Sequence, residues 1–256
     1  MNITPYYQNE LITLYQGDCL EIMPQLNIKF DACITDLPYG TTQNKWDQII
    51  SFEDMWKNLD KLIKENGAIC LFGQDKFSAK LMLSNEKNHK YNLIWKKGER
   101  TSGFLNAKRM PLRNHEDILV FYKVQPTYNP QMTKGNVSHS KGKLNKKQQN
   151  NCYGQFEDVQ TNFSEYKYPK SILNFDRPHP PIHPTQKPVS LLEYLIKTYT
   201  NENEIVLDFT AGSGTTGIAC MNLNRKCILI EKDEKYCEII VNRLKEIEKK
   251  QDEVLF

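Results

Sequence analysis

The sequence lacks the marks of several large protein classes. Its longest apolar runs, such as Ile69–Phe72 and Ile118–Phe121, have the length of β-strands, so no membrane span is expected. The N-terminus has neither a basic start nor an apolar segment, so no signal peptide is expected. The 7 cysteines are odd in number and form no C-x-x-C pair. This argues against a disulfide framework or a zinc ribbon, and favours a reducing cytoplasm.

The composition fits one large α/β domain, or a domain with an insert, because 39% of the 256 residues are hydrophobic and 25% are charged. Apolar, strand-like segments alternate with amphipathic helical ones. The predicted strands are Ile12–Tyr15, Ala32–Thr35, Ala68–Phe72, Tyr91–Trp95, Asp117–Tyr122, Glu204–Asp208 and Cys227–Glu231. The predicted helices are Phe52–Lys64, Ser190–Thr198 and Asp233–Lys249, with another after the glycine-rich turn near 212. Such alternation predicts a mainly parallel sheet covered on both faces.

Positive charge is concentrated in one part of the chain. The net charge is only +3, but residues 85–170 hold 16 Lys or Arg against 7 Asp or Glu. A localised basic segment suggests a polyanion partner such as nucleic acid, although a solvated lysine-rich loop has the same composition. Within it, residues 124–165 are rich in Asn, Gln, Lys and Gly and show no apolar period. A stretch of this length is usually functional or disordered.

A glycine-rich turn predicts a nucleotide-like ligand. Gly212, Gly214 and Gly217 form G-x-G-x-x-G after a predicted strand, and Glu231 ends the next strand. The turn would bring backbone N–H groups to the ligand, and the carboxylate would reach ribose hydroxyls. A dinucleotide site and a ligand-free tight turn are the alternatives. The carboxylate of Asp208 would repel a pyrophosphate, which argues against NAD. Too few residues follow Gly217 to build the sheet, so the remaining strands must come from the N-terminal half, in a permuted order.

The tetrapeptide Asp36–Tyr39, with the sequence Asp-Leu-Pro-Tyr, follows a predicted strand and opens a loop. An exocyclic amine on a flat base is a poor nucleophile because its lone pair is delocalised into the ring. A carboxylate and a backbone carbonyl aimed at its N–H bonds would favour the pyramidal, nucleophilic nitrogen, while an aromatic ring stacks on the base. The alternative is a plain turn with a structural aspartate.

Five motifs together resemble one family. Asp36–Tyr39 resembles the D-P-P-Y catalytic motif of S-adenosylmethionine-dependent DNA amino-methyltransferases of the permuted β class. Residues 208–216 resemble the cofactor loop of this family, and residues 183–188 resemble the motif before its cofactor-side helix. Residues 114–121 resemble the strand before its target-recognition region, and residues 17–19 resemble its adenine-contact turn. The order along the chain is that of the β class, and the resemblance spans about residues 11–243.

The resemblance implies a Rossmann-like methyltransferase fold, which is an α/β fold with a mostly parallel seven-stranded sheet, helices on both faces and a circularly permuted motif order. It divides the chain into a catalytic half (1–123), an inserted target-recognition segment (124–170) and a cofactor-binding half (171–256). It implies transfer of a methyl group from S-adenosylmethionine to adenine N6 in duplex DNA, by base flipping and in-line displacement. Asp36 is typical of adenine-N6 members, and cytosine N4 is the alternative target. No Pro-Cys pair occurs, which disfavours the thiolate mechanism of carbon-5 cytosine methylation.

Carried over by motif, Asp36 accepts the amine proton, Leu37 supplies the backbone carbonyl and, with Pro38, shapes the loop, and Tyr39 stacks on the flipped base. Leu37 departs from the family's proline, which costs stiffness but not the carbonyl. The expected cofactor-binding residues, with Glu231 on the ribose and Asp18 on the adenine, are Asp18, Cys19, Asp36, Thr185, Lys187, Asp208, Phe209, Ala211, Gly212, Ser213, Gly214, Thr215, Thr216, Glu231 and Lys232. The expected DNA-binding residues are Lys45, Trp46, Lys96, Lys97, Arg100, Lys108, Arg109, Arg113, Lys141 and Lys143.

The sequence also allows other functions, and it predicts partners and the absence of a metal site. More distant alternatives are an NAD-dependent oxidoreductase and a non-catalytic DNA-binding protein. Double-stranded DNA is the expected partner, in the cytoplasm and at the nucleoid. The resemblance also allows a cognate restriction endonuclease and a homodimer. No metal site is expected, because His179 and His183 lack a second ligand at metal spacing, and His115 is expected to pack at the start of its strand.

Overall fold

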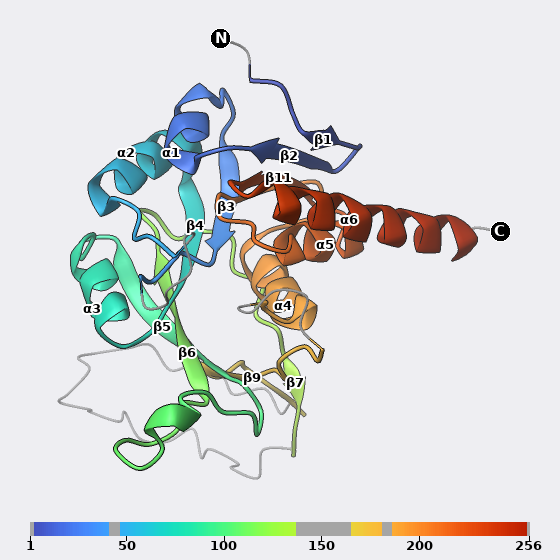
Figure 1. The fold of residues 1–256 in the computed structure, drawn as a ribbon. Helices are drawn as coiled ribbons and strands as arrows, with labels where there is room; N and C mark the ends of the chain where they lie inside the picture. Colours follow the sequence, from blue (N-terminus) through green and yellow to red (C-terminus); the bar gives the residue numbers. More distant parts are fainter. Residues whose placement is uncertain (1–2, 41–46, 137–164, 181–185, 255–256) are drawn as a thin grey trace, which may run out of the picture. The chain divides into compact units, whose positions relative to one another are not determined.

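The computed structural model describes residues 3–40, 47–136, 165–180 and 186–254 (Figure 1). The chain divides into two compact units. The larger unit comprises Met1–Asn129 and Ser171–Phe256, and the smaller is Pro130–Lys170. In the smaller unit, β7 (Thr133–Lys134) pairs with β8 (Tyr166–Lys167) as an antiparallel ladder. The two ends of the chain thus build one unit, and the smaller unit begins six residues after the predicted start of the insert at 124.

The larger unit contains a nine-stranded sheet with the order β1-β2-β11-β10-β3-β4-β6-β5-β9. The seven predicted strands form its middle: β2 (Ile12–Gln16), β3 (Phe30–Thr35), β4 (Ile63–Gly73), β5 (His89–Lys96), β6 (His115–Phe121), β10 (Ile205–Asp208) and β11 (Lys226–Glu231). The sheet exceeds the expected seven strands because β1 (Tyr7–Gln8) and β9 (Ile172–Asn174) extend its edges. Strands of two and three residues are too short to show a period in the sequence.

Most neighbours in the sheet are parallel, as expected, and the antiparallel ones are β1–β2, β4–β6 and β5–β6. Helices cover both faces (Figure 1). On one face lie α1 (Cys19–Ile22), followed by a 3-10 turn at Met23–Gln25, α2 (Phe52–Leu62) and α3 (Asp75–Leu83). On the other face lie α4 (Val189–Tyr199), α5 (Thr215–Asn222) and α6 (Glu234–Val254). This arrangement confirms the predicted α/β class.

Each face of the sheet has its own hydrophobic core. Side chains of successive strand residues point to opposite faces, so Val206 of β10 lies in the core under α4–α6 and Leu207 in the core under α1–α3. Both side chains are fully buried. These two cores explain why the strands are nearly continuous apolar runs. They confirm the sheet covered on both faces that the alternation of strands and helices predicted.

The predicted boundary of one helix is wrong. The helix expected over Phe52–Lys64 ends at Leu62, and β4 begins at the next residue, where Ile63 pairs with Phe30 of β3. The helical spacing of apolar residues runs on into the strand, because Ile63 is also buried. Pairing with β3 therefore decides the boundary, and Gly67 lies inside β4 rather than at a helix stop.

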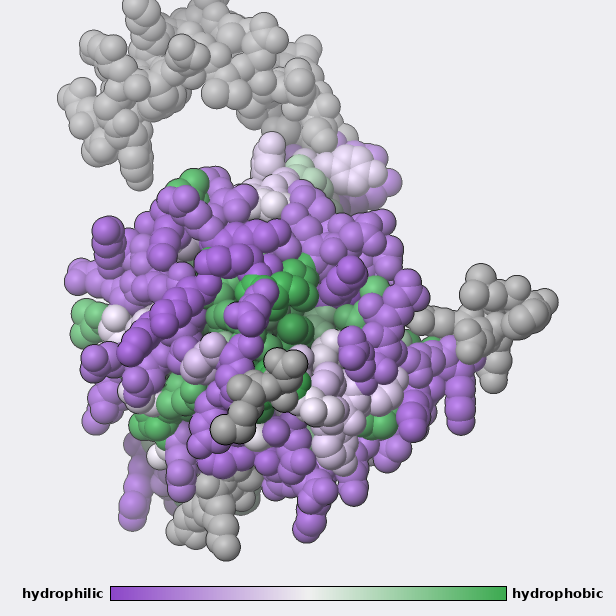
Figure 2. Space-filling view, turned by 90° about the horizontal axis from the view of Figure 1, so that it is seen from above, coloured by the Kyte–Doolittle hydropathy of each residue, from purple (hydrophilic) through white to green (hydrophobic). Residues whose placement is uncertain are grey.

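No helix in the described parts of the chain is long and apolar enough to cross a membrane. The face in Figure 2 is mostly hydrophilic, with hydrophobic residues confined to smaller areas.

Candidate active site

A cavity of about 800 Å³ opens at the carboxyl ends of the parallel strands. Two connections run in opposite directions from this point of the sheet. From β10 the chain continues through α5 to β11 on one side, and from β3 it continues through α2 to β4 on the other side. Crevices at such a switch point are the usual ligand sites of open α/β sheets. The predicted site residues that line it are Asp18, Cys19, Asp36, Leu37, Pro38, Tyr39, Lys97, Arg113, Lys187, Asp208, Phe209, Ala211, Gly212, Ser213, Thr215, Thr216, Glu231 and Lys232.

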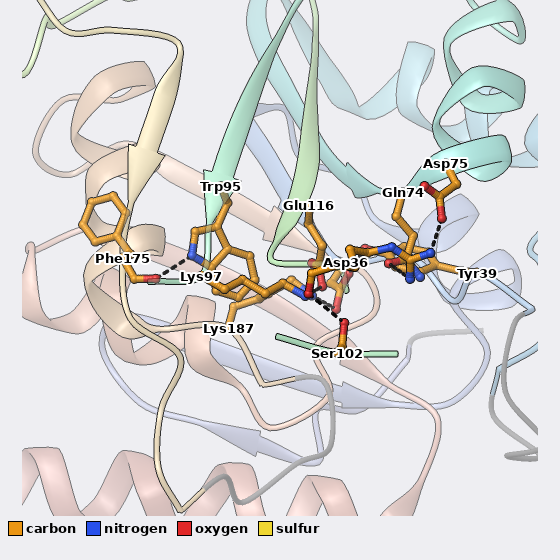
Figure 3. A network of polar contacts seen from close by, with 11 residues as sticks. Asp36, Tyr39, Gln74, Asp75, Trp95, Lys97, Ser102, Glu116, Phe175 and Lys187 are labelled. Atoms are coloured by element: carbon orange, nitrogen blue, oxygen red, sulfur yellow. Dashed lines mark hydrogen bonds and ion pairs between the residues drawn. The ribbon is translucent and has the colours of Figure 1, made fainter. Parts of the chain in front are cut away.

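Asp36 is held at three points directly after β3. The Tyr39 hydroxyl donates a hydrogen bond to Asp36 Oδ1 at 2.8 Å, and Lys187 Nζ forms an ion pair with Asp36 Oδ2 (Figure 3). The backbone carbonyl of Asp36 accepts a bond of 2.9 Å from the Thr210 hydroxyl. The Tyr39 ring packs on Phe77, with 4.9 Å between ring centroids. The carboxylate therefore has a fixed orientation at the cavity wall.

Leu37, which stands at the family's proline position, is buried with 3% of its surface exposed. Its side chain belongs to the core under α1–α3. Burial of a leucine contributes about 2 kcal/mol of hydrophobic stabilisation and fixes the loop by packing. Anchoring in the core thus replaces the fixed φ of a proline.

Asp36 is one end of a buried chain of alternating charges. Lys187 Nζ lies 3.2 Å from Glu116 Oε2, and Lys97 Nζ lies 2.5 Å from Glu116 Oε1. Two ammonium groups therefore neutralise two carboxylates, as Figure 3 shows. Such neutrality is what allows four charges to be buried together. We call Asp36, Lys187, Glu116 and Lys97 the charge chain.

The charge chain controls the protonation of its members. Burial raises the pKa of Asp36 above its ordinary value, and the Lys187 ammonium opposes that rise. Burial also raises the pKa of Glu116, but Lys187 and Lys97 overcome it and leave that pKa below its ordinary value. For Lys187, burial lowers the pKa, and the carboxylates of Asp36 and Glu116 outweigh burial and leave it raised. Lys187 is thus a stable cation beside a carboxylate with a raised proton affinity.

Glu116 was not predicted as a site residue, although it lies in the motif at residues 114–121. In β6, Glu116 shares a face with Ile118 and Val120, which are both fully buried, and it is 8% exposed itself. A carboxylate on the apolar face of a buried strand requires a cation, and this was the available signal. Lys97, expected to bind DNA, is 5% exposed and is that cation.

The loop at residues 208–216, which resembles the family's cofactor loop, is hydrogen-bonded to β3. Asp208 Oδ1 accepts hydrogen bonds from the Thr35 hydroxyl at 2.6 Å and from the Thr210 amide at 3.2 Å. Burial raises the pKa of Asp208 to about 6. Since Thr35 belongs to β3 and Asp208 to β10, the two motifs are joined where their strands end.

Gly214 permits the close packing of the cofactor loop. It has a φ of +73°, and a Cβ atom there would lie 2.8 Å from Ile240 Cγ1. We expect Gly214→Ala to lower the free energy of unfolding by about 2 kcal/mol or more, from backbone strain and overpacking together. Gly103→Ala is the matched control, because Gly103 has a φ of +87° with nothing within 4 Å of the added atom. Denaturant unfolding of both variants would measure the packing cost, and equal losses would contradict it.

Glu231 closes the opposite side of the cofactor loop. Its carboxylate accepts hydrogen bonds from the amides of Gly212 at 2.7 Å and Asp233 at 2.9 Å. Burial raises the pKa of Glu231 to about 7. Nearby, Asp18 caps α1 through the Leu20 amide and pairs with Lys232 Nζ at 3.0 Å. Together with the glycine loop, the carboxylates of Glu231 and Asp18 fit an adenosyl group, because both face a cavity of sufficient size.

The remaining predicted residues are spread more widely. Lys45, Trp46, Lys141, Lys143 and Thr185 lie outside the described residues. Gly214 is the N-cap of α5 and is not among the described residues that line the cavity. Arg100, Lys108 and Arg109 are exposed and Lys96 is half-buried, whereas Arg113 binds Gln74 Oε1 at 3.0 Å and also Asp75. The prediction that His115 packs at the start of its strand is wrong, since it is exposed while the next residue, Glu116, points inward.

Comparisons with known proteins agree with this geometry. Residues 30–242 match the DNA methylase family of N6 and N4 methyltransferases. The type II methyltransferase M2.LlaDCHI of Lactococcus lactis subsp. cremoris is 27% identical, over 94% of this chain and 91% of that one. The type II methyltransferase M.HpaI of Haemophilus parainfluenzae is 29% identical, over 84% and 68%.

Two solved structures are also similar. That of the M1.HpyAVI complex with S-adenosylmethionine has a TM-score of 0.62 and 28% identity, covering 91% of this chain and all of the other. The cytosine-N4-specific PvuII DNA methyltransferase has a TM-score of 0.68 at 14% identity, with 93% and 88% covered, and shares the fold. From the family match over most of its length, we conclude that the chain belongs to the N6/N4 DNA methylase family, whose members use S-adenosylmethionine.

Proposed function

We propose that this protein transfers the methyl group of S-adenosylmethionine to the N6 amino group of adenine in duplex DNA. The observation that carries the proposal is the position of Asp36. Its carboxylate is fixed at the wall of a cavity that also contains the glycine loop and Glu231. A methyl donor held by the loop and an amine held by Asp36 would therefore share one space, which is the main requirement of a direct displacement.

When bound, S-adenosylmethionine supplies an electrophilic methyl group on its sulfonium. The protein's part is to orient the amine and to receive the proton that the amine loses as its new nitrogen–carbon bond forms and the methyl–sulfur bond breaks, leaving a neutral thioether. Asp36 is suited to both tasks, because burial raises the pKa of its carboxyl group while the adjacent Lys187 ammonium favours the ionised form. The backbone carbonyl of Leu37 would accept the second N–H bond of the amine. Tyr39 would offer its ring to the base while its hydroxyl fixes Asp36.

The glycine loop and the carboxylates of Glu231 and Asp18 would hold the cofactor. The Glu231 carboxylate would accept hydrogen bonds from ribose hydroxyls, Asp18 would contact the adenine amine, and the loop from Asp208 to Thr216 would surround the methionine part. Lys187 would act through Asp36, the residue that accepts the proton of the amine, because the Lys187 ammonium contacts the carboxylates of Asp36 and Glu116.

Affinity for the cofactor is expected to depend on pH through Glu231. Its pKa of about 7 means that the carboxylate is mostly protonated at pH 6 and mostly ionised at pH 8. If the ionised form accepts the ribose hydroxyls, affinity should fall about tenfold from pH 8 to pH 6. Calorimetric titration at the two values measures this fall. Glu231→Gln should bind more weakly with little change between them, and a variant that retained the full dependence would contradict the assignment.

Adenine rather than cytosine is proposed because the first residue of the tetrapeptide is an aspartate. The test is transfer of labelled methyl from S-adenosylmethionine to mixed-sequence duplex DNA, followed by digestion and identification of the labelled nucleoside. Label on N6-methyladenine supports the proposal. Label on N4-methylcytosine retains the fold and the role of Asp36 and overturns the choice of base. No label, from protein that binds cofactor, contradicts the proposed activity on DNA.

Duplex recognition is proposed to use the inserted segment 124–170 together with the exposed cations Arg100, Lys108 and Arg109. Cations of this kind bind phosphates and so position the protein, whereas sequence is read from base edges. A partner endonuclease and a homodimer remain predictions from the family resemblance.

A further inference from the structure

A loop beside the cavity is closed at its base. The amide of Ser102 donates to the Arg113 carbonyl at 2.7 Å, and the amide of Arg113 donates to the Ser102 carbonyl at 3.0 Å. We call residues 102–113 the rim loop. Its base is fixed further, because the Arg113 guanidinium binds Gln74 and Asp75. The loop is therefore held as a unit rather than as a free tether.

The tip of the rim loop presents apolar side chains to solvent. Phe104 is 77% exposed and Leu105 is 85% exposed, the highest values among large hydrophobic side chains in the described parts of the chain. Both lie in a 3-10 turn, Phe104–Asn106, which is closed by a bond of 2.9 Å from the Asn106 amide to the Gly103 carbonyl. Met110 and Leu112 of the same loop are also exposed. The loop buries none of these side chains, so folding alone does not explain them.

Charge and position indicate the partner. From Arg100 to His115 the chain has four arginines or lysines and no acidic residue. Among them, Arg100, Lys108 and Arg109 are exposed, as phosphate contacts require. The base of the loop, at Ser102, Gly103 and Arg113, lines the same cavity as Asp36. An exposed apolar tip on a loop that also carries exposed cations, and whose base lines the cavity, matches DNA rather than an apolar protein face.

We propose that Phe104 and Leu105 enter the DNA base stack at the position that the target nucleotide leaves. This rests on the proposed function, because only an enzyme that takes a base out of the helix creates such a gap. Removing a base costs stacking energy and leaves an apolar gap between its neighbours. Phenylalanine and leucine are side chains that proteins insert between base steps. The cations beside them would hold the flanking phosphates while the target nucleotide enters the cavity.

The test compares Phe104→Ala/Leu105→Ala with wild type on two duplexes that carry the target site, located by footprinting of the bound protein on DNA. In one the target base is paired, and in the other it faces an abasic position. We expect at least a tenfold loss of methylation on the paired duplex, and activity within about threefold of wild type on the second, where little stacking and pairing must be broken. Leu83→Ala is the control, because Leu83 is 70% exposed on α3, outside this loop. Its activity should equal that of wild type on both duplexes.

Each outcome decides the proposal. Full activity of the double variant on the paired duplex, or an equal loss on both duplexes, overturns it. Cofactor affinity and melting temperature should not change, since the two side chains are exposed, and their loss would show a structural role instead. If wild-type protein methylates neither duplex, the proposed function fails. Fluorescence of 2-aminopurine at the target position then tests insertion alone: a rise with wild type that the double variant lacks supports it, and equal signals overturn it.

Discussion

Asp36→Asn should lower the rate of methyl transfer by roughly 10³-fold while cofactor affinity stays within a fewfold of wild type. The amide keeps the size of the side chain and one acceptor oxygen, but it cannot take the proton that the amine releases. A positioned general base typically contributes 10²- to 10⁴-fold. The variant also leaves Lys187 opposite a neutral group, so part of the loss would come from a displaced Lys187. Single-turnover methylation of duplex DNA, with separate titration of cofactor, measures the two effects.

The matched control for this variant lies on the same strand. Asp31, near the start of β3, also pairs with a lysine, Lys64, at 2.6 Å, and it accepts the Ile205 amide at 3.0 Å. Asp31→Asn therefore removes a carboxylate of the same strand, in a similar ion pair, away from the cavity. It should cost some stability and leave the turnover rate of the folded protein unchanged. If both variants lost activity equally, the loss would reflect the strand rather than the site.

Lys187→Met should give the second largest effect, a loss of about 100-fold near pH 7.5. Glu116 would keep the Lys97 ammonium while Asp36 would lose the ammonium of Lys187, and the pKa of Asp36 would rise further. A protonated Asp36 cannot accept the amine proton. The sign follows: the acidic limb of the pH–rate profile should move to higher pH, and raising the pH should recover part of the activity. Breaking a buried ion pair also costs about 3–5 kcal/mol of stability, so unfolding must be measured in parallel.

A second substitution separates charge from packing at Lys187. Lys187→Met/Glu116→Gln removes one cation and one anion, and the remaining Asp36 and Lys97 again sum to zero charge. We expect the double variant to be about tenfold more active than Lys187→Met, with its acidic limb moved back toward that of wild type. Because Lys187 acts through Asp36, it is a positioning residue. An unchanged pH profile in the single variant would show that only the size of the side chain matters.

The elements that the sequence predicted well are those with a strong local signal. The strands ending at Thr35, Asp208 and Glu231 each combine an apolar run with a turn, and all three were expected to end at these residues. Parallel strands carry the loops at their carboxyl ends to one edge of the sheet. The structure brings them to one cavity.

What the sequence could not predict depends on contacts between distant segments. Lys97 and Glu116 are adjacent to the site only because β5 and β6 pair with Trp95 opposite Glu116. From charge alone, Lys97 resembles any other basic residue of its segment, and it was assigned to DNA. The end of α2 at Leu62 likewise depends on the pairing of Ile63 with Phe30. Register and partner choice are tertiary properties that local patterns do not contain.

The hydrogen bond between Thr35 and Asp208 also has a consequence for how the protein is made. These two residues are 173 positions apart, and they join the strand that carries Asp36 to the strand that carries the cofactor loop. During synthesis β3 leaves the ribosome long before its neighbour β10 exists, so the middle of the sheet must wait with an open edge. Non-local pairing of this kind slows folding and exposes the unpaired strand to aggregation. A nascent chain would contain Asp36 long before it contained the loop that follows β10, so neither half of the proposed site could act before both were made.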